Sequence, residues 1–288
     1  MIILGGNSCE KLTNKVSANL GLGLTLPVIK RFPDGEKYVR IEADVYGEEV
    51  ILIQSITSPH DENLVELLML LDAAKSNGGS ITTVIPYYGY GRQDRAFNPG
   101  EAVSSRVVAN HVQLYSEKVI TINPHKEHIL DYFAVPTTSI DAAPLIGKYF
   151  KGLKLDNPVV VAPDKGSVDM ARRVSDVLGC RCENCSKKRL GPGKVVTSAE
   201  NLNLNGEDVI IVDDIIDSGG TIIEACKVLK ERGAGSIHVA CVHPVLTNNA
   251  GEKILKHADG LVATDTIKTP YSKISIAGLI VQELKKSV

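Results

Sequence analysis

The segment VIIVDDIIDSGGT, residues 209–221, begins with four aliphatic residues and continues into acidic and small ones. A run that is apolar at every position is typical of a parallel strand covered by helices on both faces. Two adjacent acids, Asp213 and Asp214, follow it, and a third acid, Asp217, precedes Ser-Gly-Gly-Thr. A helix-like stretch, 222–230, comes next. The segment therefore predicts a strand, a tight turn and a helix of an α/β fold.

Seven other runs rich in β-branched residues lie along the chain, with helix-like segments between them. They are residues 2–4, 50–56, 81–86, 119–123, 159–163, 237–243 and 261–264. Between the second and third runs, leucines recur at helical spacing from residue 64 to residue 71, which predicts a packing helix. Strands that alternate with helices indicate parallel α/β architecture.

The length of the chain, 288 residues, exceeds the usual size of a single domain, and 43% hydrophobic residues is enough for two cores. We expect two similar domains, each a mostly parallel sheet flanked by helices. The boundary is expected near residues 141–144, which gives domains 1–143 and 144–288. The two halves have a similar order of strands and helices, but no repeated sequence establishes a duplication.

The formal net charge of −2 provides no broad basic field for nucleic acid or anionic lipid. The amino terminus, MIILGG, has no basic region before its apolar run, and no apolar segment reaches the roughly 18 residues of a membrane span. These features predict a cytoplasmic protein that binds neither nucleic acid nor membranes. Any site for a phosphate must then be built from a few local groups.

Three of the six cysteines, Cys180, Cys182 and Cys185, have a spacing that suggests a metal site. A structural zinc site takes four ligands, often as two spaced pairs, and this cluster has neither a second pair nor a nearby histidine. Reduced, unpaired thiols are the favoured interpretation.

The turn Ser218, Gly219, Gly220 and Thr221 predicts an anion site. Small residues let the backbone approach a phosphate, and the amino end of the following helix directs N–H groups towards it. Asp213 and Asp214 could hold ribose hydroxyls or Mg²⁺. Acidic turns before a helix are common, but the full run resembles the phosphoribosyl pyrophosphate motif shared by type I phosphoribosyltransferases and the synthetases that make their substrate. The resemblance implies a ribose phosphate ligand, with Asp217 also in its loop.

The segment RFPDGEKYVR, residues 31–40, resembles the adenine-binding segment of those synthetases. The resemblance implies that Phe32 stacks on the base and that Asp34 and Glu36 accept hydrogen bonds from it. By itself, Pro-Asp-Gly is equally typical of a turn that opens a strand.

The segment PYYGYGRQDR, residues 86–95, follows the third predicted strand and resembles the synthetase loop that binds the phosphates of ATP. Arg92 is the expected phosphate contact, because a guanidinium group matches phosphate oxygens and stays charged. Gln93 is expected to add a hydrogen bond. Arg95 is interpreted as a solvated charge.

His125 and Asp164 each follow an apolar run and resemble the two residues that help to hold Mg²⁺ on ATP in the synthetases. A lone residue at a strand end is more often structural, but the carboxyl ends of parallel strands are where ligands bind. Asn123-Pro124-His125 departs from the Asp-Leu-His of the family, which affects the surroundings of the histidine. His128 is interpreted as a surface residue.

The segment SKKRLGPGK, residues 186–194, resembles the catalytic flap of the synthetases. The Lys-x-Arg pair of that flap maps onto Lys187 and Arg189, with Lys188 at the variable position. A basic tripeptide is usually only solvated. Its order in the chain, after Asp164 and before Asp213, favours the catalytic interpretation.

With five motifs in order, the chain resembles the ribose-phosphate pyrophosphokinases (phosphoribosyl pyrophosphate synthetases), the short archaeal members in particular. The resemblance implies a Mg²⁺-dependent transfer of pyrophosphate from ATP to ribose 5-phosphate. It also implies a homo-oligomer whose ATP site borrows residues from a neighbouring subunit. The alternatives are a nucleobase phosphoribosyltransferase and a catalytically silent regulatory relative, and formation of AMP from ATP and ribose 5-phosphate would distinguish the three.

Overall fold

The structure is a computed structural model that describes residues 1–191, 194–198 and 202–286. Contacts divide the chain into two compact units, each built on a six-stranded sheet. The first unit comprises Met1–Asp141, Thr266–Lys268 and the segment from Ser275 onward, and the second comprises Ala142–Asp265 and Thr269–Ile274.

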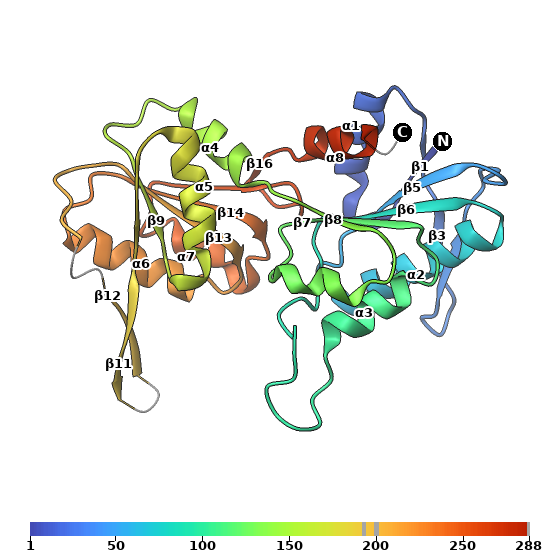
Figure 1. Cartoon of the computed structure of the whole chain (residues 1–288), viewed down its shortest axis with the longest axis horizontal. Coiled ribbons are helices and arrows are strands. Elements are labelled where there is room, and N and C mark those ends of the chain that lie inside the picture. The colour runs from blue at the N-terminus through green and yellow to red at the C-terminus, as the bar shows by residue number, and fades with distance from the viewer. Residues whose placement is uncertain (192–193, 199–201, 287–288) are drawn as a thin grey trace. The chain divides into compact units, whose positions relative to one another are not determined.

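In the first unit, six parallel strands lie in the order β2-β1-β5-β6-β7-β8. The strands are β1 (Ile2–Gly5), β2 (Leu24–Thr25), β5 (Glu49–Ile53), β6 (Ser80–Ile85), β7 (Lys118–Ile122) and β8 (Thr137–Ile140). The helices are α1 (Glu10–Leu20), α2 (His60–Ser76), α3 (Ser104–Val112) and α8 (Ala277–Lys285), with the short 3-10 helices η1 (Asn7–Cys9) and η2 (Glu127–Tyr132). Helices α1 and α8 cover one face of the sheet, and α2 and α3 cover the other (Figure 1). This double cover explains why Val50 to Ile53 are buried at every position.

In the second unit, six parallel strands lie in the order β10-β9-β13-β14-β15-β16. The strands are β9 (Val159–Ala162), β10 (Arg181–Asn184), β13 (Val209–Ile216), β14 (Ile237–Pro244), β15 (Gly260–Thr264) and β16 (Ser272–Ile274). The helices are α4 (Ala143–Lys151), α5 (Val168–Leu178), α6 (Gly220–Glu231) and α7 (Ala250–Ile254), with the 3-10 helices η3 (Lys165–Ser167) and η4 (Thr247–Asn249). The strand order repeats that of the first unit, so β13 corresponds to β5 and β9 to β1.

Two antiparallel hairpins stand apart from the six-stranded sheets. Strands β3 (Val28–Arg31) and β4 (Lys37–Arg40) form one hairpin in the first unit. Strands β11 (Ser186–Gly191) and β12 (Lys194–Ser198) form the other in the second unit. Figure 1 shows the second hairpin extending away from its sheet. Both hairpins contain segments to which the sequence assigns chemistry.

The predicted α/β class is confirmed, and all eight apolar runs form strands of the two parallel sheets. The expected helices are α2 and α6. The units differ from the expected domains 1–143 and 144–288 at the C-terminus, because the segment that contains α8 belongs to the first unit. The apolar side of α8 packs on α1, and Lys118 of β7 forms an ion pair with Glu283 at 3.2 Å.

All six cysteines are free thiols. Cys182 belongs to β10, which lies at the edge of its sheet, and Cys185 is buried in the core of the second unit. Burial raises the pKa of the Cys185 thiol to about 11. Within the described ranges, none of the helices has both the length and the apolar character that crossing a membrane requires.

Candidate active site

The anion loop of the second unit lies between the central strand β13 and helix α6. Gly219 has a φ of 77°, and a Cβ atom there would lie 3.1 Å from Cδ1 of Ile254. Both the left-handed backbone and the close approach of α7 therefore favour glycine at this position. Ser218 and Gly220 are exposed, and Thr221 is half-buried in the first turn of α6. This loop leaves the amino end of a twelve-residue helix accessible to a phosphate.

Carboxylates from two neighbouring strands meet at the same edge of this sheet. Asp213 lies near the end of β13, and Asp164 follows β9. The Ser167 hydroxyl donates a hydrogen bond to the Asp213 carboxylate, which ties the loop after β9 to β13. Oδ1 of Asp164 accepts a hydrogen bond from the Gly166 amide at 2.9 Å. The structure thus brings Asp164, Asp213 and Asp214 together, as expected for strand ends in a parallel sheet.

The pKa of Asp213 is raised to about 7. Burial is the main cause, and the negative charges of Asp214 and Asp164 add to it. A cation placed among these carboxylates would favour the ionised form. Among the residues that the structure describes, no three His, Cys, Asp or Glu side chains form a preassembled metal group. Mg²⁺ is usually held by one or two carboxylates together with phosphates and waters, so the donors at this edge fit it.

Asp213→Asn is expected to stabilise the metal-free protein, by about 4 kcal/mol at pH 8. The folded-state pKa lies above the usual value, so the stability that this carboxyl contributes falls as the pH rises from about 4 to about 7. Asparagine keeps an oxygen for the Ser167 hydroxyl and carries no charge. Urea unfolding of both proteins in EDTA at pH 5 and pH 8 measures the effect. Equal gains at the two pH values would contradict the assignment.

Asp217 is oriented by a residue for which the sequence provides no pattern. The Thr247 hydroxyl, from η4 after β14, donates a hydrogen bond to Oδ1 of Asp217 at 2.6 Å. Ser167 is a second residue of this kind, since nothing in Lys-Gly-Ser after Asp164 indicates a contact with Asp213. Each contact joins a loop to a neighbouring strand or to the loop that follows it, so both arise only in the folded sheet.

In the first unit, the turn of the β3–β4 hairpin carries Phe32, Asp34 and Glu36. The Phe32 amide donates to the Glu36 carbonyl at 2.8 Å, and the Glu36 amide donates to Oδ1 of Asp34 at 3.1 Å. The Pro-Asp-Gly segment is therefore a turn between two strands, with Gly35 at a φ of 98°. Phe32 is 51% exposed, and its ring forms an edge-to-face pair with Tyr38, with ring centroids 6.0 Å apart. Such a ring can stack on a planar base, so the turn is compatible with adenine binding.

The loop after β6 carries Arg92 and Gln93 and passes beside His125. Arg92 is exposed, and a Cβ atom on Gly91 would lie 3.8 Å from Cβ of His125. The Gln93 amide is engaged within the loop, donating to the Arg95 carbonyl and to Glu101, each at 3.1 Å. Gln93 therefore supports the shape of the loop in this structure, and its contact with ATP stays a prediction.

Glu101 organises this loop, although no sequence motif indicates it. Its carboxylate accepts hydrogen bonds from the Asn98 side chain and from the Phe97 and Asn98 amides. These bonds lower the pKa of Glu101 to about 2. His128 is partly exposed and lies 3.1 Å from the buried Asp94 carboxylate. His128 is thus a surface residue, as predicted, and it also contacts a buried residue of this loop.

The departure at Asn123 has a structural explanation. Asn123 has a φ of 35°, a backbone region that asparagine tolerates better than most residues. Its side-chain amide donates to Oδ1 of Asp141 at 3.0 Å. His125 lies two residues later and belongs to the first unit. Asp164 belongs to the second unit, so each residue is described within its own unit.

Lys187 and Arg189 are alternate residues of strand β11. In the register of the hairpin, Lys187 is paired with Thr197 and Arg189 with Val195. Their side chains lie outside the described part of the structure, so the catalytic role that the sequence predicts for them stays a prediction.

Known proteins resemble this chain over nearly its whole length. Residues 1–115 match the family model of the N-terminal domain of ribose phosphate pyrophosphokinase, and residues 128–273 match that of the phosphoribosyl transferase domain. The ribose-phosphate pyrophosphokinase of Methanothermobacter thermautotrophicus is 42% identical over 287 residues, which cover 99% of this chain and 100% of that protein. The one of Methanosarcina acetivorans is 40% identical over 287 residues, with the same coverage.

Among solved structures, phosphoribosylpyrophosphate synthetase from Mycobacterium smegmatis superimposes with a TM-score of 0.88 and 27% sequence identity. The match covers 99% of this chain and 98% of that one. Both halves of the chain are thus accounted for by one family. The chain belongs to the ribose-phosphate pyrophosphokinase family.

Proposed function

We propose that this enzyme transfers the pyrophosphoryl group of ATP to the anomeric hydroxyl of ribose 5-phosphate, which yields phosphoribosyl pyrophosphate and AMP for nucleotide biosynthesis. The observation that carries the proposal is the anion loop at the amino end of α6, beside the carboxylates of Asp164, Asp213 and Asp214. The first unit adds an exposed aromatic ring at Phe32 and an exposed cation at Arg92, which suit a nucleotide triphosphate.

In this reaction, the anomeric oxygen attacks the β-phosphorus of ATP and loses its proton. The bond between the β-phosphorus and the oxygen that bridges to the α-phosphorus breaks, and AMP leaves. The enzyme works mainly by alignment and by stabilising charge on the transferred and leaving oxygens. Residues 218–221 bind the 5-phosphate, and Asp213 and Asp214 orient the ribose hydroxyls. Arg92, Lys187 and Arg189 stabilise the polyphosphate charge.

Mg²⁺ is the metal that we assign to the reaction, where it would neutralise charge on the ATP phosphates. His125 and Asp164 would hold it, with Asp213 or Asp214 available to a second ion. The carboxylate oxygens suit Mg²⁺, and phosphate oxygens of ATP would provide further ligands.

The direct test is to quantify AMP and phosphoribosyl pyrophosphate made by the purified protein from ATP, ribose 5-phosphate and Mg²⁺. Equal amounts of the two products are expected. If both ligands bind but neither product forms, the chain is a regulatory relative of the enzyme. If it instead consumes phosphoribosyl pyrophosphate together with a nucleobase, it is a phosphoribosyltransferase.

Asp217→Ala and Thr221→Val are expected to raise KM for ribose 5-phosphate by on the order of tenfold to hundredfold, the value of a hydrogen bond to a charged group. KM for ATP should change little, because the loop binds the sugar phosphate. Thr137→Val, which removes a hydroxyl from β8 of the first unit, is the matched control. Equal increases in the two KM values would contradict the assignment of this loop.

We also propose that the enzyme is a cytoplasmic homo-oligomer in which neighbouring subunits share the ATP site. Exposed apolar side chains on β4 and α2, among them Tyr38, Val65 and Met69, support an interface with another chain. Free thiols support a reducing compartment. Light scattering coupled to size exclusion tests the oligomeric state, and a monomeric enzyme with full activity would contradict a shared site.

A further inference from the structure

The β3–β4 hairpin is held by contacts outside itself. It forms its own two-stranded sheet, separate from the six-stranded sheet of the first unit. An isolated hairpin is at best marginally stable in water. Its turn carries Phe32, Asp34 and Glu36, so the position of this turn depends on what anchors the strands to the rest of the unit.

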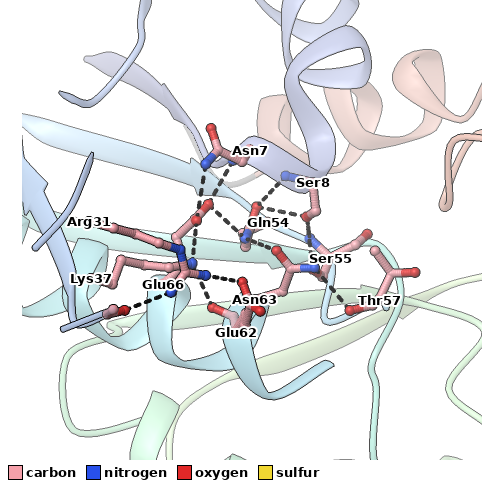
Figure 2. A network of polar contacts seen from close by, with 11 residues as sticks. Asn7, Ser8, Arg31, Lys37, Gln54, Ser55, Thr57, Glu62, Asn63 and Glu66 are labelled. Carbon is pink, nitrogen blue, oxygen red and sulfur yellow. Dashed lines mark hydrogen bonds and ion pairs between the residues drawn. The ribbon is translucent and has the colours of Figure 1, made fainter. Parts of the chain in front are cut away.

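Lys37, the first residue of β4, provides a buried anchor directly after Glu36. Its ammonium group lies 2.8 Å from Oε2 of Glu66 and donates to the Glu62 carbonyl at 2.9 Å (Figure 2). Only 9% of the Lys37 side chain and 1% of the Glu66 side chain are exposed. The anchor therefore joins the root of the turn to helix α2 through two largely buried side chains.

Glu66 in turn joins α2 to the carboxyl ends of two sheet strands. Oε1 of Glu66 accepts hydrogen bonds from the Asn7 amide at 2.8 Å and from the Gln54 side chain at 3.1 Å. The Asn7 side chain donates to Oε2 at 3.2 Å. Gln54 accepts from the Ser8 hydroxyl at 2.7 Å. Asn7 and Ser8 follow β1, and Gln54 follows β5, so one carboxylate connects the hairpin to the centre of the sheet (Figure 2).

The network is fully satisfied: among the side chains of residues 1–185 and 202–286, no buried nitrogen or oxygen lacks a hydrogen-bond partner. A satisfied buried polar network makes a structure rigid, because each member accepts only one geometry. A buried ion pair adds little net stability compared with apolar residues of the same size. The ion pair between Lys37 and Glu66 therefore fixes the position of the hairpin and contributes little to the stability of the fold.

A second anchor is weaker. Arg31 of β3 forms an ion pair with Glu62, but about half of each side chain is exposed, and exposed pairs contribute little. Arg31 also donates to the Gly35 carbonyl at 2.7 Å, which stays within the hairpin. Lys37 is thus the buried ionic connection between the turn and the sheet.

We propose that Lys37 and Glu66 are positioning residues that hold the Phe32–Glu36 turn in place to receive the adenine end of ATP. The proposal rests on the proposed function. Neither residue touches the nucleotide; each acts through the turn. A displaced turn weakens ATP binding and leaves the ribose 5-phosphate loop, in the other unit, unchanged.

Lys37→Met is expected to raise KM for ATP by on the order of tenfold to hundredfold, since a misplaced binding group costs about that much. KM for ribose 5-phosphate should stay the same. Lys75→Met is the matched control, because Lys75 forms an exposed ion pair with Glu117 elsewhere in the first unit. Amide hydrogen exchange in residues 31–40 should become faster in Lys37→Met and not in Lys75→Met.

The double variant Lys37→Met, Glu66→Gln distinguishes an effect on the position of the turn from an effect on the stability of the protein. It leaves no unpaired buried charge, and the glutamine oxygen still accepts from Asn7 and Gln54, so the unfolding midpoint should return towards that of the wild type. KM for ATP should remain raised. A double variant whose KM recovers together with its stability would show that the pair is only structural and would overturn the proposal, as would unchanged KM for ATP in folded Lys37→Met. Absence of AMP formation by the wild type would instead refute the proposed function.

Discussion

A Lys187→Ala, Arg189→Ala double variant will lower kcat by on the order of 10³-fold or more, while KM for both substrates changes little. In phosphoryl transfer, cations act chiefly on charge that develops in the transition state, so their loss reduces turnover more than ground-state binding. Initial rates of AMP formation, with each substrate varied in turn, measure both constants.

Lys188→Ala is the matched control for this variant, because it removes the same kind of charge from the intervening position of β11. Its kcat should remain close to that of the wild type. If Lys188→Ala is as damaging as the double variant, the whole basic strand contributes and the Lys-x-Arg assignment is wrong. If the double variant retains kcat, the catalytic cations lie elsewhere.

Arg92→Ala will lower kcat/KM for ATP by on the order of 10²-fold or more, because a guanidinium group that pairs with phosphate makes charge-assisted hydrogen bonds. KM for ribose 5-phosphate should be nearly unchanged. Direct titration with ATP and Mg²⁺ measures the loss of binding independently of turnover.

Arg95→Ala is the control in the same loop. Arg95 is exposed, and its guanidinium carbon lies 5.3 Å from the centre of the Phe97 ring. The guanidinium group therefore has a favourable contact within the protein that does not involve ATP. Equal losses in Arg92→Ala and Arg95→Ala would mean that a general basic field, and not a specific contact, attracts ATP. A larger loss in Arg95→Ala would reverse the assignment of the two residues.

The parallel strands were predictable because each one is marked by a run of contiguous apolar residues. The run at 209–212 is aliphatic since helices cover both faces of β13, and the same reason applies to β5 and β9. The short edge strand β2 and the half-buried β8 were not predicted, because few buried positions leave little apolar pattern. For the same reason, the sequence predicts a turn that opens a single strand where the structure has the β3–β4 hairpin.

The candidate site likewise contains residues that the sequence predicts and residues that only the structure reveals. Gly219 stands where a positive φ and the approach of α7 require glycine, so the loop is visible as a motif. No sequence motif indicates Glu101, Ser167 or Thr247. Each contacts a partner that is distant in the sequence or that loop geometry holds in place. The raised pKa of Asp213 comes mainly from burial, which only folding produces, and the charge of Asp164, which follows another strand, adds to it.

The sequence by itself determined the α/β class and the family, and it predicts the residues that bind ribose phosphate and ATP, since strand patterning, small-residue turns and basic segments are properties of contiguous residues. Only the tertiary structure decided that α8 belongs to the first unit and that Lys37 and Glu66 form a buried pair. Packing brings such residues together across many positions of the chain, and no local pattern records which partner a buried charge will meet.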